Sequence, residues 1–310
     1  MSAPGPGTLH PQSRIYVAGH RGLVGSALCA FLEAGGHRVR RLVRRAPRGP
    51  GEFRWDTFTG AIDPRAVEGA DAVVHLAGEG IAARRWSRAQ KQRILQSRRE
   101  GTRQVADAVR AARAKPRVFV SASATGFYGD RGDEELDERS AAGAGFLARV
   151  CREWERSARD LTGVRGVELR LGVVLSPAGG ALARMLRPFR LGLGGPVGSG
   201  RQWVSWIALD DALYAIHHAL FDEALTGPVN AVSPSPVANA ELARALGRVL
   251  RRPAFTPLPA AGARALFGEL AEEALLASRR VRPRRLEASG FAWTHPDLER
   301  ALRHLLGGTT

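Results

Sequence analysis

Short apolar runs alternate with longer segments of helical periodicity through the first half of the chain. The runs are rich in β-branched residues, which is typical of buried strands, and they cover residues 14–18, 38–43, 72–76, 117–122 and 167–174. Apolar positions recur with helical spacing in residues 23–35, 87–113 and 146–161. Strands that alternate with helices in this way predict an α/β fold with a doubly wound parallel sheet.

The pattern changes after Ser176. A glycine-rich stretch, LGLGGPVGSGRQW (191–203), precedes a predicted strand at 203–207, a helix from Asp210 and a strand at 229–232, and the tail from Asn239 is rich in helical periodicity. We therefore expect three parts. Residues 1–12 form a loose tail, and residues 13–175 form a core to which residues 203–232 also contribute. Residues 176–202 and 233–310 form a smaller C-terminal α+β lobe.

The segment YVAGHRGLVGSAL, Tyr16 to Leu28, places three glycines directly after the first predicted strand. Gly19, Gly22 and Gly25 have the spacing G-x-x-G-x-x-G and open the first predicted helix. Such a turn lets the backbone approach a pyrophosphate, which the helix N-terminus attracts through its N–H groups and its dipole. We expect Gly19 to allow the turn, Gly22 to let the backbone approach the phosphates, and Gly25 to let helix and strand pack closely. The pattern predicts a dinucleotide-binding (Rossmann) core.

The second predicted strand indicates which nicotinamide cofactor is bound. NAD sites usually carry an acidic residue near the end of this strand, where it binds the ribose 2′-hydroxyl. Here the strand ends in RRLVRRAP, so that Arg44 and Arg45 stand in that place. Two guanidinium groups attract a 2′-phosphate. The sequence therefore favours NADP(H), with a solvated basic edge as the alternative.

Composition restricts the class of protein but does not indicate which reaction it catalyses. The chain has 310 residues, of which 44% are hydrophobic and 25% charged, as in ordinary globular proteins. The net charge of +16 comes almost entirely from scattered arginines, and no nucleic-acid-binding motif accompanies them, so we expect no specific nucleic-acid partner. Two cysteines, no secretory leader and no apolar stretch of membrane-spanning length lead us to expect a cytoplasmic protein with free thiols and no membrane association.

Several motifs together resemble one family. The glycine turn, DAVVHLAGEGIA (71–82), FVSASATGFYGD (119–130) and WIALDD (206–211) resemble the extended short-chain dehydrogenases/reductases, in the branch of the NAD-dependent epimerases/dehydratases. SRREGTR (97–103), FLARVCREWE (146–155) and the glycine-rich segment resemble more narrowly the "epimerase family protein" group of atypical NADP(H)-binding oxidoreductases. The resemblance covers about residues 14–306 and implies a Rossmann core with a small substrate lobe.

The resemblance also implies cofactor contacts. Those implied beyond the glycines and Arg44 and Arg45 are Leu23, Val24, Leu76, Ala77, Gly78, Arg98 and Val174. Arg98 would contact an anionic group, and Val174 would lie near the nicotinamide. One departure is that the chain reads Gly78-Glu79-Gly80 where relatives usually have Gly-Glu-Asn, which removes one amide side chain.

The usual proton-transfer pair of these enzymes is missing from the sequence. Extended reductases use Tyr-x-x-x-Lys on the helix after the serine-bearing strand, where the Lys lowers the pKa of the Tyr. No lysine occurs after Lys115. The corresponding helix carries Phe146 or Leu147 at the tyrosine position and Val150 or Cys151 at the lysine position.

Two interpretations follow. In the first, Ser121, Ser123 and Tyr128 are the catalytic candidates, and either Arg170 or an arginine of the helix at 146–161 supplies positive charge. Their alternative roles are strand-end hydrogen bonding for the serines and packing for the tyrosine. In the second, the protein binds NADP(H) without ordinary catalysis, as a sensor or structural partner.

A small-molecule substrate would lie against the segment that follows the glycine-rich stretch. Arg201, Trp203 and Trp206 are candidates to line its pocket, or else they are core and rim residues. The histidines considered as metal ligands, His75, His217 and His218, lack ligand spacing, so the sequence predicts no metal site. A homodimer is the expected assembly.

Overall fold

A seven-stranded parallel sheet in the order β11-β7-β5-β4-β1-β2-β3 forms the centre of the computed structural model, which describes residues 12–57 and 59–307. Its strands are β1 (Arg14–Ala18), β2 (Arg38–Val43), β3 (Glu52–Arg54), β4 (Ala72–His75), β5 (Val118–Ala124), β7 (Arg165–Leu171) and β11 (Gly227–Ala231). The order confirms the predicted doubly wound α/β fold. The expected tail over residues 1–12 lies, up to residue 11, outside the described residues.

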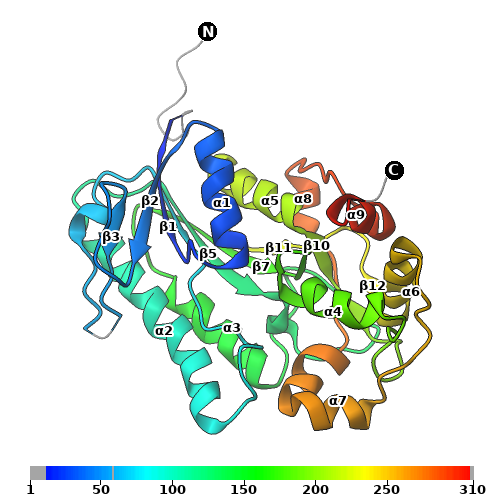
Figure 1. Ribbon diagram of the computed structural model, residues 1–310. Coiled ribbons are helices and arrows are strands. Elements are labelled where there is room, and N and C mark those ends of the chain that lie inside the picture. Colours follow the sequence, from blue (N-terminus) through cyan, green and yellow to red (C-terminus); the bar gives the residue numbers. More distant parts are fainter. Residues whose placement is uncertain (1–11, 58, 308–310) are drawn as a thin grey trace.

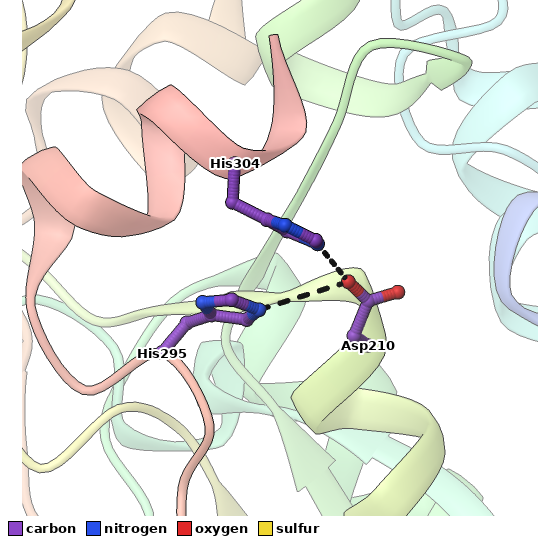
Figure 2. A group of neighbouring side chains, drawn as sticks. All are labelled: Asp210, His295 and His304. Atoms are coloured by element: carbon purple, nitrogen blue, oxygen red, sulfur yellow. Dashed lines mark hydrogen bonds and ion pairs between the residues drawn. The ribbon is translucent and has the colours of Figure 1, made fainter. Parts of the chain in front are cut away.

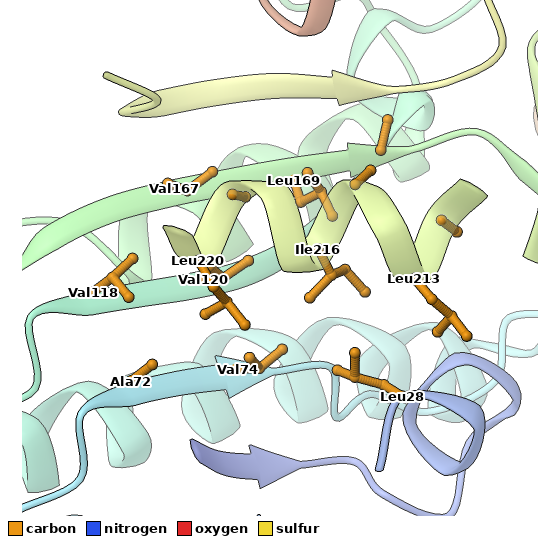
Figure 3. Packing of buried hydrophobic residues seen from close by; sticks show 14 of the residues in the cluster. Leu28, Ala72, Val74, Val118, Val120, Val167, Leu169, Leu213, Ile216 and Leu220 are labelled. Atoms are coloured by element: carbon orange, nitrogen blue, oxygen red, sulfur yellow. The ribbon is translucent and has the colours of Figure 1, made fainter. Parts of the chain in front are cut away.

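Helices cover both faces of this sheet (Figure 1). On one face lie α1 (Leu23–Ala34) and α5 (Leu209–Phe221), and on the other α2 (Arg88–Ala111) and α3 (Phe146–Ser157). Side chains of each strand alternate between the faces, so Val120 and Leu169 pack with Ile216 of α5 (Figure 3), whereas Phe119 joins the cluster beneath α2. Each such fully buried aliphatic side chain contributes about 1.5–3 kcal/mol.

The later elements form a separate hydrophobic cluster beside the sheet. The remaining helices are α4 (Gly180–Arg190), α6 (Asn239–Leu250), α7 (Ala260–Phe267), α8 (Arg284–Ala288) and α9 (Leu298–Leu305), with the short helices η1 (Pro64–Ala66), η2 (Thr125–Tyr128) and η3 (Ala271–Leu276). Three small two-stranded sheets pair β8 (Val173–Ser176) with β10 (Trp206–Ala208), β9 (Trp203–Val204) with β12 (Val237–Ala238), and β6 (Glu135–Leu136) with β13 (Arg280–Val281). Among the helices of the described ranges, none has the length and apolar character to cross a bilayer.

Two predicted strands are each divided in two. The expected strand at 167–174 ends at Leu171 and resumes at Val173, because the backbone changes partner at Gly172. The N–H of Gly172 donates to Ala231 O (3.0 Å), and that of Val173 donates to Ser205 O (2.8 Å). A Cβ at Gly172 would lie 2.7 Å from the Ser205 oxygen, so only glycine fits. The expected strand at 203–207 is likewise interrupted at Ser205.

The turn between β1 and α1 brings three backbone segments into close contact. Gly19 has φ +94°, and a Cβ on it would lie 2.7 Å from Ala77 N in the segment after β4. A Cβ on Gly25 would lie 2.1 Å from Gly19 O, closer than any van der Waals contact allows. The structure thus confirms the predicted roles of Gly19 in the turn and Gly25 in the close packing of helix on strand.

We expect Gly25→Ala to destabilise the protein by about 1–3 kcal/mol, because the added methyl must displace the Gly19 turn. Gly49→Ala is the matched control, since a Cβ there meets nothing within 4 Å. Urea denaturation should place the control within about 0.5 kcal/mol of the wild type. Equal stability of the two variants would contradict the close-contact argument.

His75 is fully buried at the end of β4, where its ring lies edge-on to Trp55 at a centroid distance of 6.3 Å. Within the described residues neither ring nitrogen has a hydrogen-bond partner. Burial, reinforced by the charge of Arg98, lowers the pKa of His75 to about 3. The folded protein therefore keeps this histidine neutral, while the unfolded chain takes up a proton as the pH falls below about 6.5.

This difference in pKa predicts acid destabilisation. Stability is complete above the unfolded-state pKa and declines as the pH falls toward the folded-state value. Between pH 7 and pH 5 we expect His75 to account for a loss of about 2 kcal/mol. His75→Leu should remove that share, and the difference between the two pH profiles of unfolding free energy measures it. Parallel profiles would show that His75 is not the group responsible.

Candidate functional site

The carboxyl ends of β1, β2 and β4 form one edge, as the parallel sheet requires. Helix α1 begins there at Leu23, with Gly22 as an N-cap that supplies no side-chain hydrogen bond and with no acidic residue in the first turn. The first N–H groups of a helix have no intrahelical acceptor, so those of Leu23 and Val24 are donors for a ligand. An uncapped helix start beside a glycine turn suits a pyrophosphate.

Positive charge gathers beside this helix start, after β2. Arg44 is exposed, whereas Arg45 is partly buried and donates to both carboxylate oxygens of Glu52, at 2.7 and 2.5 Å. Burial and the charges of Arg41 and Arg21 lower the pKa of His20 in the glycine turn. Arg44 and Arg45 make this end of β2 cationic, which suits a phosphate, whereas the lowered pKa of His20 favours its neutral form.

Glu52 is a carboxylate at this edge that the sequence pattern did not reveal. Its hydrogen bonds from Arg45, and that from the Arg48 N–H (2.7 Å), lower the pKa of Glu52 to about 2. Because these donors already engage Glu52, its role here is to orient Arg45. Strand β3, which begins with Glu52, is too short and polar to be recognised by its pattern.

The segment after β4 is held by α2. Arg98 donates from Nη1 to Glu79 O (2.8 Å) and stacks on Trp154 at 4.8 Å, while Ser97 Oγ accepts the N–H of Glu79 (3.0 Å). A Cβ on Gly78 would lie 3.1 Å from the Arg98 guanidinium. Arg98 therefore fixes the path of Leu76, Ala77 and Gly78 along the same edge as the glycine turn.

Val174 reaches this edge from a distant part of the chain. It is half-buried in β8, and the tight turn after β8 places Gly180 next to it, where a Cβ would lie 3.5 Å from Val174 O. The same Cβ would lie 3.3 Å from the Leu23 side chain at the start of α1. The structure thus brings β8 beside the glycine helix.

The three catalytic candidates are buried. Ser121 and Ser123 are 1% and 2% exposed, and Tyr128 is fully buried. Ser121 donates a long hydrogen bond to the adjacent Ala122 O (3.4 Å), whereas Ser123 donates to Glu155 Oε1 (2.8 Å). The serines match strand-end hydrogen bonding, which was their alternative role.

Tyr128 belongs to a buried polar network. Its hydroxyl donates to Asn230 Oδ1 (2.7 Å) and accepts from Arg170 Nη1 (3.0 Å). Arg170 also forms a two-bond ion pair with Glu155, through Nε (2.8 Å) and Nη2 (2.9 Å). Asn230 continues the network to Arg282 O (3.0 Å) in the segment between β13 and α8. Burial raises the pKa of Tyr128 to about 12, so its phenol stays protonated.

Helix α3 presents apolar side chains toward η2. Leu147 and Cys151 face η2, since a Cβ on Gly126 would lie 3.4 Å from Leu147 Cβ and 3.7 Å from Cys151 Sγ. Burial raises the pKa of Cys151 to about 11, which keeps it a thiol. The N-terminus of α3 is capped from the lobe, because Glu273 accepts the N–H groups of residues 146 and 147 at 2.8 and 3.1 Å.

The three substrate candidates lie in different environments. Arg201 is exposed, and Trp203 is half-buried, donates to Asp133 (2.9 Å) and lies beneath Arg280 at 4.6 Å. Trp206 is fully buried among α4, α6 and α9, and its indole donates to Ser235 O (2.9 Å). This burial contradicts the expectation that Trp206 lines a pocket; it is a core residue, which was its alternative role.

A cavity of about 690 Å³ is lined by α2, by the start of α3, and by Glu269 and Glu273 of the C-terminal segment. None of the three substrate candidates lines this cavity. Two of the histidines considered as metal ligands, His217 and His218, have different partners. His217 stacks on Phe221 at 4.4 Å, and His218 pairs with Asp222 at 3.3 Å.

Residues 15–230 match the NAD dependent epimerase/dehydratase family, and residues 258–305 match a domain of unknown function, DUF1731. An epimerase family protein of Mycobacterium tuberculosis is 46% identical over 290 residues, covering 93% of this chain and 96% of the relative. The crystal structure of human epimerase family protein SDR39U1 with NADPH superposes with a TM-score of 0.88 at 38% identity, over 96% of this chain and all of that one. A nucleoside-diphosphate sugar epimerase from Corynebacterium glutamicum superposes with a TM-score of 0.78 at 38% identity, over 95% of this chain and 58% of that one.

These matches confirm the resemblance drawn from the motifs, from the glycine turn to the C-terminal segment. The chain belongs to the NAD-dependent epimerase/dehydratase family, and within it to the epimerase family proteins that carry a C-terminal DUF1731 domain.

Proposed function

We propose that this protein binds NADP(H) and transfers hydride between it and a small carbonyl or hydroxyl compound. The observation that carries the proposal is the pairing of an uncapped helix start with the cationic end of β2 along one sheet edge. The first suits a pyrophosphate and the second a 2′-phosphate, which distinguishes NADPH from NADH. The human relative, crystallised with NADPH, supports the same choice.

Each part of this edge has a role in the proposal. The N–H groups of Leu23 and Val24 bind the pyrophosphate, and Arg44 and Arg45 bind the 2′-phosphate. The backbone from Leu76 to Gly78 follows the adenosine, with Arg98 holding that backbone in place. The remaining expected contact, Val174, would lie near the nicotinamide, and bound NADPH would supply the hydride there.

Proton transfer is the step of the proposed reaction that the side chains of this site assist least. A positioned general acid typically contributes about 10²–10⁴-fold to the rate, and α3 carries Leu147 and Cys151 where the usual acid and its lysine would stand. Tyr128 is engaged on both sides by Asn230 and Arg170. We therefore expect slow turnover, in which solvent water delivers the proton to the substrate oxygen.

A second function is a binding protein that senses or stores NADPH without turnover. The buried network favours it, because Ser123 and Tyr128 serve the fold through their bonds to Glu155, Arg170 and Asn230. The two functions differ in whether any carbonyl compound oxidises bound NADPH.

Arg44→Ala and Arg45→Ala should each weaken NADPH binding by about 10- to 100-fold, the equivalent of one hydrogen bond to a charged group. NADH binding should change little, since NADH lacks the 2′-phosphate. Arg38→Ala removes an exposed guanidinium from the opposite end of the same strand and serves as the control. Calorimetric titration with both cofactors compares the wild type with the three variants. Equal losses for NADH and NADPH would place the arginines away from the 2′-phosphate.

Catalysis and binding can be measured separately in the same protein. NADPH-loaded protein incubated with a panel of aldehydes, ketones and sugar nucleotides should oxidise the cofactor slowly, as followed at 340 nm. Tyr128→Phe should lower the unfolding free energy by about 1–3 kcal/mol, because Arg170 and Asn230 lose a buried partner, yet keep the turnover. Ser123→Ala is expected to behave in the same way. Tight NADPH binding without oxidation by any compound would favour the sensor, whereas loss of turnover in folded Tyr128→Phe would make Tyr128 the acid.

A further inference from the structure

Asp210, His295 and His304 meet at the surface from three places in the fold (Figure 2). Asp210 lies in the first turn of α5, His295 precedes α9, and His304 lies in the last turn of α9. Asp210 Oδ2 lies 2.7 Å from His304 Nε2 and 3.9 Å from His295 Nε2. One ligand atom from each of the three residues lies within 4.8 Å of the other two.

The backbone around this cluster is held by groups outside it. Asp211, the fully buried neighbour of Asp210, accepts the N–H groups of Thr294 (2.8 Å) and His295 (3.0 Å). Asp297 caps α9 by accepting the N–H of Arg300 (2.9 Å). The two imidazole rings stack at a centroid distance of 4.1 Å with 22° between their planes. The histidines are therefore placed by the fold and do not need an ion to bring them together.

We propose that Asp210, His295 and His304 bind a divalent transition-metal ion of the Zn²⁺ type, with water in the remaining positions. Two imidazole nitrogens and one carboxylate oxygen are donors that Zn²⁺ and its neighbours in the first row prefer over Mg²⁺ or Ca²⁺. A tetrahedral ion with bonds of about 2.0–2.2 Å holds its donors about 3.4 Å apart. The present separations of 2.7 and 3.9 Å from Asp210 Oδ2 fall on either side of that value, and the two stacked imidazoles must rotate until their nitrogens converge on the ion.

The cluster is open to solvent on one side. The side chains of Asp210 and His304 are 38% and 48% exposed, and that of His295 is 15% exposed. An ion can therefore enter without unfolding. Once bound, it would join α9 of the C-terminal segment to the start of α5, which covers the central sheet, and this role does not depend on the proposed redox function.

The sequence pattern predicts no metal site, because 94 positions separate Asp210 from His304 and only the fold joins them. A second surface pair, His218 with Asp222 at 3.3 Å, has the same two ligand types. No third metal-ligating side chain completes that pair among the residues described. It provides a matched control within the same chain.

The test uses the full chain after treatment with EDTA and gel filtration. Equilibrium dialysis with Zn²⁺ should give one ion per chain, and Co²⁺ should give the visible d–d absorption of a low-coordinate site. His304→Gln, His295→Gln and Asp210→Asn should each weaken binding at least tenfold and remove the Co²⁺ spectrum, while His218→Gln should leave both unchanged. Zn²⁺ should raise the Tm of the wild type and of His218→Gln only.

Two results would overturn the proposal: no binding of either ion by the wild type at 100-fold excess, or equal binding by the wild type and the three cluster variants. His304→Gln is the most informative variant, because the exposed His304 side chain can change without disturbing the core. Unchanged NADPH binding in that variant would show that its loss of metal is local.

Discussion

The buried ion pair between Glu155 and Arg170 is the interaction on which most of the site depends. Their side chains are 2% and 3% exposed, so neither charge can be left unpaired without a large penalty. This ion pair links α3 to β7. The hydrogen bond between Arg170 and Tyr128 links them in turn to η2. The same guanidinium lies 3.5 Å from the centre of the Phe127 ring, which fills the space around it. The elements at the carboxyl edge of the sheet are thus held by charge as well as by apolar packing.

This network explains why familiar catalytic residue types have a structural role here. A serine at the end of a central strand and a tyrosine in the following turn resemble members of a catalytic set. Each is turned inward by a charged partner, Ser123 by Glu155 and Tyr128 by Arg170. Both side chains therefore serve the interior of the fold in this structure.

The alternation of strands and helices and the glycine turn could be predicted because both depend on local pattern. The breaks within the predicted strands could not be predicted in this way. Gly172 separates β7 from β8 only because the backbone of Ser205 lies against it. The same limit applies to the site. Arg44 and Arg45 are visible in the sequence, but the pairing of Arg45 with Glu52 depends on an edge strand of three residues. The burial of Trp206 depends on α4, α6 and α9 meeting around it, which no single segment encodes.

The position of β11 has a consequence for the order in which the protein is made. The other six strands of the central sheet are complete once residue 171 has been synthesised, but β11 follows only after α4 and α5. Until then β7 is an open edge, and Tyr128 lacks Asn230, its partner from β11. A nascent chain at this stage carries an ion pair and a phenol on a surface that water still reaches. Unpaired edges of this kind invite association with other chains, so the pairing of β11 with β7 covers an edge that would otherwise favour aggregation.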